Sequence, residues 1–501
     1  MGFSLLGYRD ELKIGAGRLY IDGEWTDSAG EDRWEHVHPA TGEVITSIAN
    51  GTAEDADRAV RAARRAFDEG PWPRMKARER ARVLRTIGDR LRAASPRMSR
   101  IQVLDTGTPL RFTSAFRASA EFAADLFDYH AGWIDKLSGE TVPQFTERNT
   151  LQYLTFREPI GVVAAIVPWN APVLQLANKL APALAAGCTV VVKPSEYASL
   201  AVLEFVELLA DLDLPPGVVN VVTGVGAAAG AALASHPGVN KVSFTGSQGV
   251  GKSILEASGA GIKRVTLELG GKSPALVFPD ADARAAGRAV MSMIAMGLTG
   301  QQCTAQTRAL VHADVYDEFL AGTREIAAEV RFGDPFDEAT TSAPMINKAQ
   351  LEKVLHYIEL GKQEARAELL FGGDRPGGEL SDGNWVGPAV FTGLDPHGPV
   401  AREEIFGPVL AVFPFTTEAD AIRQANDSEY GLAAGIYTHD LTRALRVSRL
   451  LHTGAVGVNG YSFMPNAPIG GVKASGLGRE GSRTALEAYT ELKTVMIDLG
   501  E

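Results

Sequence analysis

The sequence predicts an α/β protein with two parallel sheets covered by helices and a small β extension. Three observations support this prediction. From about residue 160, continuous apolar runs alternate with helical patterns, and such runs are typical of parallel strands buried on both faces. A second alternation of the same kind begins near residue 274 and continues to about residue 460. A chain of 501 residues is also too long for a single hydrophobic core, so two or three domains are expected.

Two helical regions are expected ahead of the first sheet and form a helical front portion. Residues 52–70 carry helical periodicity, with Ala59, Ala63 and Phe67 on one stripe. Residues 77–135 are predicted to be helical as well.

The two alternations supply the strands of the two sheets. Strands of the first sheet are predicted at 160–167, 189–193, 218–222, 241–245 and 263–267, with helices at 172–186 and 200–212. Strands of the second sheet are predicted at 274–278, 307–312, 409–415 and 455–459. The segments 146–159 and 491–499 alternate weakly and fit neither sheet, and such strands tend to pair with each other or with another subunit.

The composition disfavours several classes of function. A net charge of −12 argues against a nucleic-acid partner, which would need a clustered basic face. Two cysteines cannot build a disulfide framework, which favours a reduced, cytoplasmic setting. The N-terminus lacks the pattern of a cleavable signal, and polar residues and glycines interrupt the most membrane-like stretch, 218–234. The nine histidines form no cluster with metal-ligand spacing, so no catalytic metal is expected.

Cys303 is the first candidate for chemistry. It lies in a polar stretch, and Glu268 ends an apolar run 303 − 268 = 35 residues upstream, so the two groups meet only if the fold brings them together. A thiol nucleophile and a water-activating carboxylate are what a hydrolytic oxidation through a thioester needs. The alternatives are a solvated strand-end carboxylate and an inert core cysteine, which is the role expected of Cys188.

A literal P-loop pattern occupies residues 246–253, after a predicted strand and at the start of a helix. Alone it would indicate a nucleotidase, because a helix N-terminus offers N–H groups to phosphates. The preceding strand is the fourth of its sheet, however, and nucleotide hydrolysis would leave Cys303, Glu268 and Asn170 unused. The P-loop nucleotidase therefore stays as a disfavoured alternative.

Seven motifs occur in an order that resembles the aldehyde dehydrogenase superfamily. They are PWN at 168–170, KPSE at 193–196, FTGS at 244–247, ELGG at 268–271, QQC at 301–303, EIFGP at 404–408 and SGLGRE at 475–480. Each motif is weak alone, but together they are specific and span nearly the whole chain. The resemblance implies NAD(P)-dependent oxidation of an aldehyde to the free acid. Members that pass the acyl group to coenzyme A generally lack the carboxylate found here at Glu268.

The resemblance assigns catalysis to Cys303, Glu268 and Asn170. Cys303 would form a thiohemiacetal and then a thioester, Glu268 would activate water, and the Asn170 amide would donate to the oxyanion. The residues alone leave open that Asn170 instead caps the helix starting near residue 172. Lys179 and Glu480 match positions linked to proton relay in some members, with a structural salt bridge as the alternative.

The same resemblance implies a cofactor site. The implied contacts are Trp169, Lys193, Glu196, Gly246, Ser247, Gly270, Glu404 and Phe406. An acidic side chain facing the adenosine ribose at Glu196 favours NAD over NADP, because it would repel a 2′-phosphate. The alternatives are a surface ion pair between Lys193 and Glu196 and plain core packing of Phe406.

The expected substrate pocket departs from the acetaldehyde-type pattern. Its residues are Ala171, Gln175, Asn178, Gly297, Met464 and Ile469. Ala171 and Gly297 stand where larger side chains are common, and Gln175 and Asn178 stand where Met and Trp are often found. The implied pocket is roomier and more polar on one wall, which favours a bulky or functionalised aldehyde.

The resemblance also divides the chain. It implies a Rossmann-like NAD-binding domain over 1–141 and 161–271, a catalytic α/β domain over 272–474, and oligomerisation strands at 142–160 and 485–501. A cytoplasmic homodimer or homotetramer without a nucleic-acid or membrane partner is expected. A catalytically silent relative that keeps the fold is the other alternative, although all the chemical residues are present.

Overall fold

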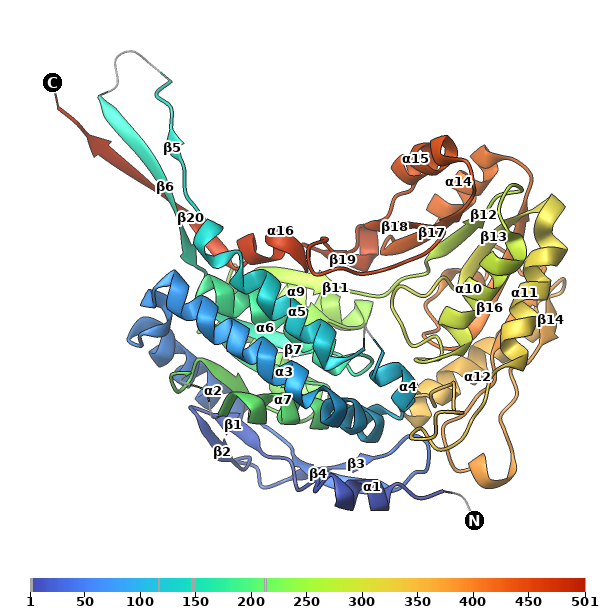
Figure 1. Cartoon of the computed structure of the whole chain (residues 1–501), viewed down its shortest axis with the longest axis horizontal. Coiled ribbons are helices and arrows are strands. Elements are labelled where there is room, and N and C mark those ends of the chain that lie inside the picture. The colour runs from blue at the N-terminus through green and yellow to red at the C-terminus, as the bar shows by residue number, and fades with distance from the viewer. Residues whose placement is uncertain (1–2, 116–117, 146–149, 211, 213, 501) are drawn as a thin grey trace.

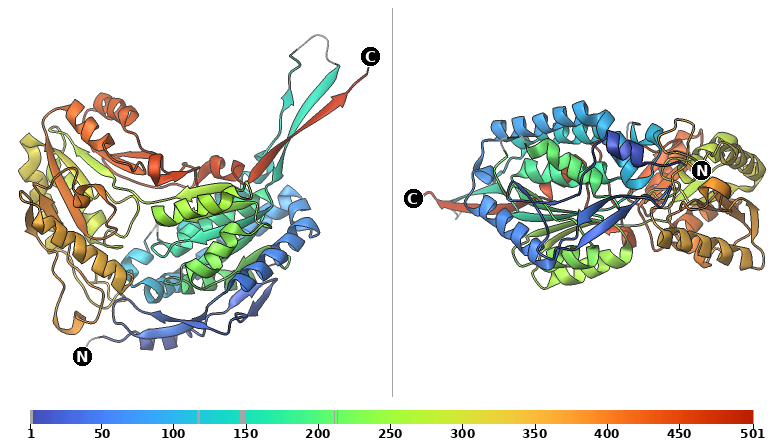
Figure 2. Two further views of the ribbon diagram at one scale, coloured as in Figure 1. Left: turned by 180° about the vertical axis from the view of Figure 1, so that it is seen from behind. Right: turned by 90° about the horizontal axis from the view of Figure 1, so that it is seen from below.

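The computed structural model of the chain describes residues 3–115, 118–145, 150–210, 212 and 214–500. Its main body holds two large sheets with helices on their faces, and a thin β ribbon projects away from this body (Figures 1 and 2). The α/β fold class with two parallel-sheet units and a β extension is therefore confirmed.

The first sheet has eight strands in the order β19-β11-β10-β7-β8-β9-β1-β2. Its parallel centre consists of β7 (Val162–Val167), β8 (Thr189–Pro194), β9 (Val219–Val221), β10 (Lys241–Thr245) and β11 (Arg264–Glu268). Its antiparallel edges are β1 (Leu19–Ile21), β2 (Glu24–Thr26) and β19 (Gly476–Leu477). All five strands predicted for this sheet are present.

Alternate residues of β7 contribute to two different hydrophobic cores, so helices cover both faces of this sheet. One core contains residues of α3 (Ala77–Thr106), α5 (Ala120–Ala131), α6 (Pro172–Ala186) and α7 (Leu200–Ala210). The other contains residues of α2 (Ala53–Asp68), α8 (Ala231–Ser235) and α9 (Gln248–Gly259). This double cover explains why the strands read as continuous apolar runs.

The second sheet has seven strands in the order β14-β15-β16-β13-β12-β17-β18. They are β12 (Pro274–Val277), β13 (Arg308–His312), β14 (Glu368–Phe371), β15 (Ala389–Thr392), β16 (Val409–Phe415), β17 (Ala433–Tyr437) and β18 (Ala455–Val458). Only β14 is antiparallel to its neighbour within this sheet, as far as the described residues show. Its faces are covered by α10 (Ala283–Ala295) and α11 (Tyr316–Ala328), and by α12 (Lys348–Gln363), α14 (Glu418–Asn426) and α15 (Leu441–Leu450).

The projecting ribbon is a three-stranded sheet of β5 (Thr141–Val142), β6 (Leu151–Pro159) and β20 (Thr490–Asp498). Strands β6 and β20 pair antiparallel along their whole length, from Thr490 opposite Pro159 to Asp498 opposite Leu151. The predicted pairing of the two stray segments is confirmed, and residues 146–149 of the first segment lie outside the described residues.

The N-terminal region holds four strands that the sequence analysis did not assign. β1 and β2 form a hairpin whose turn residues Asp22 (φ 57°) and Gly23 (φ 86°) both adopt positive φ, as a type I′ turn requires. β3 (Arg33–Val37) and β4 (Val44–Ala49) pair with each other. The remaining short helices are α1 (Leu6–Glu11), α4 (Leu110–Thr113), α13 (Pro399–Arg402) and α16 (Ser482–Glu487).

Candidate active site

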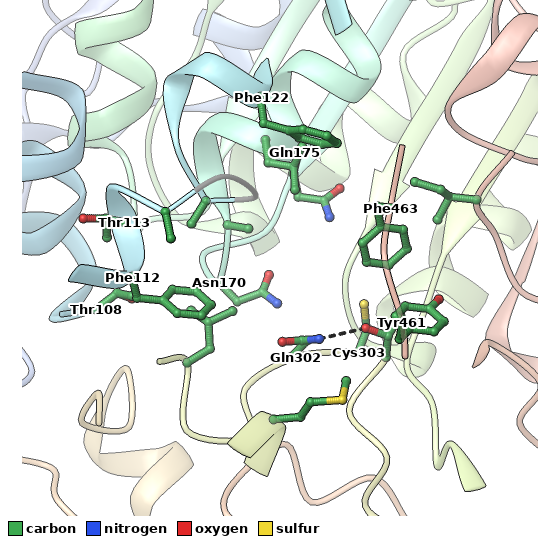
Figure 3. Close-up of a pocket in the computed structure, with 18 of the residues that line it drawn as sticks. Thr108, Phe112, Thr113, Phe122, Asn170, Gln175, Gln302, Cys303, Tyr461 and Phe463 are labelled. Carbon is green, nitrogen blue, oxygen red and sulfur yellow. Dashed lines mark hydrogen bonds between the residues drawn. The ribbon is translucent and has the colours of Figure 1, made fainter. Parts of the chain in front are cut away.

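Cys303, Glu268 and Asn170 all line one cavity of about 610 Å³. Figure 3 shows Cys303 and Asn170 in this cavity. Asn170 lies between the end of β7 and the start of α6, and Glu268 is the last residue of β11. Cys303 lies in the loop between α10 and β13. The carboxyl ends of parallel strands are where α/β sheets bind ligands, so the fold places all three groups where chemistry is expected.

The loop that carries Cys303 is held in an unusual backbone conformation. Gly297, Thr299 and Gly300 have φ values of 63°, 53° and 72°. A side chain at Gly300 could not be accommodated, because its Cβ would lie 2.3 Å from the Gly407 carbonyl oxygen. The Thr299 hydroxyl accepts from the Ala343 N–H at 2.7 Å, which compensates for the positive φ of a non-glycine residue. The Cys303 loop is therefore held closely against Gly407 and Ala343.

Close packing of Gly271 explains how residues 35 positions apart in the chain meet. A Cβ at Gly271 would lie 2.7 Å from the Cys303 carbonyl oxygen, so only glycine lets the segment after Glu268 approach the cysteine loop. The Cys303 thiol is half-buried. Burial, together with the negative charges of Glu404 and Glu268, raises the pKa of this thiol to about 12. In the free protein the sulfur is therefore held as a thiol, and a base must remove its proton.

Glu268 is a buried carboxylate with an unpaired oxygen. Its side chain lines the cavity, and Oε1 has no hydrogen-bond partner among the described residues. Burial and the negative charge of Glu480 raise the pKa of Glu268 well above that of an ordinary glutamate, against the lowering effect of Lys179. A carboxylate with a raised pKa and a free lone pair is suited to accept a proton from a thiol or a water molecule.

The Asn170 amide points toward the cysteine loop. Its Nδ2 donates to the Gln301 carbonyl oxygen at 3.0 Å, and the second hydrogen of the same NH₂ group remains available to another acceptor. Helix α6 begins after Ala171 as N-cap, with no side-chain cap. The cap role that the residues alone left open for Asn170 is therefore wrong.

A buried ion pair lies behind Glu268. Lys179 Nζ donates to Glu480 Oε1 and to Thr245 Oγ1, both at 2.6 Å. Lys179 is fully buried, and Glu480 lines the same cavity as Glu268. Thr245 Oγ1 in turn donates to Gln175 Oε1 at 3.4 Å. The arrangement is a connected set of proton donors and acceptors that ends beside Glu268.

Lys193 and Glu196 form an ion pair at the end of β8, with Nζ and Oε2 3.3 Å apart. Lys193 is almost fully buried, and an added Cβ at Gly226 or Gly230 would lie 3.8 Å from its side chain. Because Lys193 is buried, the pair is not the exposed surface pair that was the alternative. Nearby, Ser247 caps the N-terminus of α9 by accepting from the Val250 N–H.

Glu404 is anchored beside the glycine pair that follows Glu268. Glu404 Oε1 accepts from the Gly271 N–H at 3.0 Å, and a Cβ at Gly270 would lie 2.1 Å from its carboxylate. Phe406 adopts a positive φ of 59°, and its ring meets the Trp169 ring edge-on at 5.4 Å. A carboxylate held by a glycine pair and two packed aromatic rings are groups that could contact the ribose and the flat ring of a nucleotide.

In the P-loop alternative, Asp280 at the end of the run 278–280 would be the metal ligand, and the structure places it elsewhere. Asp280 follows β12 in the seven-stranded sheet, whereas α9 follows β10 in the eight-stranded sheet. Asp280 accepts from the Thr438 hydroxyl and from two backbone N–H groups, and it pairs with Arg443. Lys252 is exposed on α9. These contacts place and occupy Asp280 in the other sheet, so it does not serve as a metal ligand for the 246–253 segment.

Four of the six expected substrate-pocket residues line the cavity, namely Ala171, Gln175, Asn178 and Ile469. Gly297 and Met464 are absent from its described lining. A Cβ at Gly297 would lie 2.4 Å from the Phe112 ring, so Phe112 fills the space that the small residue was expected to open. Met464 is about half exposed on the surface.

Five aromatic residues of the cavity wall were not anticipated, namely Phe112, Phe122, Tyr437, Tyr461 and Phe463. Figure 3 shows the rings of Phe112, Phe122, Tyr461 and Phe463 around the same open space as Asn170, Gln175 and Cys303. The rings of Tyr461 and Phe463 meet edge-on at 5.1 Å. The position of Tyr461 and Phe463 just after the strand predicted at 455–459 was a signal in the sequence that they lie near the site. Phe112 and Phe122 carried no such signal, because they lie in helices far from any motif.

Within the described part of the chain, no group of three or more His, Cys, Asp or Glu residues could hold a metal ion. No described helix is both long enough and apolar enough to cross a membrane.

Comparison with known proteins places this geometry in a family. A model of the aldehyde dehydrogenase family matches residues 25–495. Aldehyde dehydrogenase 1 of Tanacetum cinerariifolium is 44% identical over 95% of this chain and 94% of its own length. The cytosolic aldehyde dehydrogenase 1 of Mus musculus is 42% identical over 98% of this chain and 96% of its own.

Solved structures agree with this result. The betaine aldehyde dehydrogenase of Staphylococcus aureus in complex with NAD+ matches with a TM-score of 0.95 at 36% identity, covering 99% of this chain and 98% of that one. An NAD-dependent aldehyde dehydrogenase of Sinorhizobium meliloti gives a TM-score of 0.95 at 38% identity, covering 100% of this chain and 98% of that one.

Proposed function

The chain belongs to the aldehyde dehydrogenase family, whose reaction is NAD-dependent aldehyde oxidation, and we propose that Cys303, Glu268 and Asn170 carry this reaction to the free carboxylic acid. The observation that supports it most is the shared cavity, in which a thiol, an unpaired carboxylate oxygen and an amide donor converge. All three chemical groups are in place, which argues against a silent relative.

The first step is attack of Cys303 sulfur on the aldehyde carbon. The raised pKa of the thiol requires a base, and Glu268 is the cavity carboxylate whose own pKa is raised by burial. The free hydrogen of Asn170 Nδ2 and the Cys303 backbone N–H donate to the developing oxyanion. Removing one such donor typically lowers the rate by about 10²–10³-fold.

The residues around Glu404 and Phe406, with the Lys193–Glu196 pair, fit the two ends of the cofactor. The chemistry that NAD supplies when bound is acceptance of a hydride, which turns the thiohemiacetal on Cys303 into a thioester. Before it can act again, Glu268 must release the proton taken from the thiol, and Glu480 and Lys179 supply a buried route for that proton, since both of their charges act on the pKa of Glu268. Glu268 then takes a proton from the water that hydrolyses this thioester.

We expect Glu196 to set the preference for NAD over NADP. Its carboxylate would repel a 2′-phosphate, so Glu196→Gln should lower the NAD/NADP ratio of kcat/KM by about tenfold, equivalent to roughly 1.4 kcal/mol of like-charge repulsion. Steady-state kinetics with both cofactors measures this ratio. Glu207→Gln, an exposed charge on α7, is the control that should leave it unchanged. An unaltered ratio in Glu196→Gln would remove Glu196 from cofactor selection.

The cavity supports a substrate larger than acetaldehyde. With about 610 Å³ and five aromatic residues in its lining, it can bury a ring that acetaldehyde lacks. We expect kcat/KM for benzaldehyde to exceed that for acetaldehyde by at least about tenfold, given the transfer free energy of several buried CH groups. Ala171→Phe should lower the value for benzaldehyde much more than that for acetaldehyde. The substrate proposal would be rejected if acetaldehyde had the highest kcat/KM of an aldehyde panel.

The remaining expectations concern assembly and location. Exposed apolar side chains on the projecting ribbon, among them Phe156, Leu492 and Met496, support a homodimer or homotetramer built through β6 and β20. The eight-, seven- and three-stranded sheets support the proposed division into an NAD-binding domain, a catalytic domain and oligomerisation strands. A cytoplasmic location is supported by the name of the mouse relative, although an Arabidopsis thaliana relative, 42% identical, is named mitochondrial.

A further inference from the structure

Asn178 places an unpaired amide oxygen in the wall of the cavity. The residue is 4% exposed, and its Oδ1 has no hydrogen-bond partner among the residues that the structure describes. A buried amide without a partner destabilises a folded protein, and such groups are rare in native structures unless a function retains them. The position is therefore a candidate for a contact with a ligand.

Four other polar side chains that line the cavity already have hydrogen-bond partners. The hydroxyls of Thr106, Thr113 and Ser292 donate to backbone carbonyl oxygens at 2.9, 3.0 and 2.8 Å. Gln102 Nε2 donates to the Ala118 carbonyl oxygen at 3.1 Å. Asn178 differs from these residues because its buried acceptor is left for whatever occupies the cavity.

Asn178 faces the body of a bound aldehyde and not its carbonyl. Ala171, Leu174, Gln175 and Asn178 share one face of α6 and all line the cavity. Asn178 is 178 − 171 = 7 residues beyond Ala171, which is about 10 Å along a helix axis. The carbonyl end of the substrate is held at Asn170, so the Asn178 amide lies along the rest of the molecule.

The charge and shape of the wall narrow the class of substrate. Among the described lining residues there is no Lys, Arg or His, and the only acids are Glu268 and Glu480. An anionic substrate body would therefore have no cationic partner there. The five aromatic rings offer flat apolar contact, which suits a planar ring and can also hold a cation.

We propose that Asn178 is a specificity-determining residue that hydrogen-bonds a hydroxyl group on an aromatic aldehyde. This rests on the proposed function, because it assumes that the aldehyde carbon is held at Cys303. A hydroxyl both donates and accepts, so it pairs with either end of the amide. A substrate without the hydroxyl displaces cavity water from Asn178 without replacing its hydrogen bond, which lowers affinity.

Matched pairs of aldehydes test the proposal with NAD present. The pairs are para-(hydroxymethyl)benzaldehyde with para-ethylbenzaldehyde, and meta-hydroxybenzaldehyde with meta-methylbenzaldehyde, so that only the hydroxyl changes. We expect the wild-type protein to prefer the hydroxyl member of at least one pair by about tenfold or more in kcat/KM. Asn178→Leu should abolish that preference, while it keeps or improves turnover of the alkyl member.

Gln175→Leu is the matched control, because Gln175 is the neighbouring amide of the same helix face and its Oε1 already accepts from Thr245. It should leave the preference in place. The proposal is overturned if the wild-type protein shows no preference in either pair, or if the preference survives in Asn178→Leu. Failure of the proposed function would look different, since the wild-type protein would then reduce NAD with none of the four aldehydes.

Discussion

Cys303→Ala is expected to lower kcat/KM for every aldehyde by at least about 10⁴-fold, because Cys303 is the only thiol among the described lining residues of the cavity. Cys188, the other cysteine, is fully buried beneath β8 and donates to the Tyr489 carbonyl oxygen, so it cannot substitute. The measurement is reduced-nicotinamide formation with saturating NAD and a range of aldehyde concentrations.

Two controls show that such a loss is chemical. The first control is Cys188→Ala, which should keep most of the activity. The second is the NAD affinity of Cys303→Ala, measured by calorimetry. It should stay within about threefold of the wild-type value, since cavity contacts to the cofactor are unchanged. Activity of Cys303→Ala within tenfold of the wild type would show that another group is the nucleophile.

Glu268→Gln is expected to separate the two halves of the reaction. Amide replacement preserves shape but removes the base, which typically contributes about 10²–10⁴-fold. We expect a burst of up to one reduced cofactor per active site, followed by turnover slowed in this range. Rapid-mixing absorbance measures both phases. Unchanged steady-state turnover in Glu268→Gln would exclude Glu268 as the water-activating base.

The pH profile gives a second test of Glu268. The group acts when deprotonated, and burial together with Glu480 raises its pKa. Turnover should therefore rise with pH as Glu268 loses its proton. The midpoint of this acid limb should lie at a higher pH than it would for a glutamate with an ordinary pKa. In Glu268→Gln this acid limb should disappear. Glu480→Gln removes the like charge, lowers the pKa of Glu268 and should move the limb toward lower pH.

Much of the fold could be predicted because local pattern and burial agree. Helix α6 and strands β10 and β16 begin and end where their apolar patterns do. β1 and β2 could not be predicted in the same way, because each has three residues. β1 joins the sheet only through Tyr20 opposite Val221, and a pairing across about 200 residues leaves no local signal.

In the site, too, some features could be predicted from the sequence and others depend on tertiary contacts. The motifs pointed to Cys303, Glu268 and Asn170, but only the tertiary structure shows why they meet, through Gly271 against the cysteine loop. Gly297 was expected to enlarge the pocket, but the free space beside a glycine depends on the side chains packed around it. Here Phe112 from α4 occupies that space. The unpaired oxygen of Asn178 is likewise invisible in sequence, because hydrogen-bond satisfaction depends on atoms from several elements.

The central claim is that the acyl group is held on one sulfur before water releases it. The direct measurement is peptide mass spectrometry of Glu268→Gln after brief reaction with benzaldehyde and NAD, quenched in acid. The account predicts a benzoyl group on the peptide that contains Cys303 and nowhere else. A full burst of reduced cofactor with no acylated Cys303, or with the benzoyl group on another residue, would contradict it.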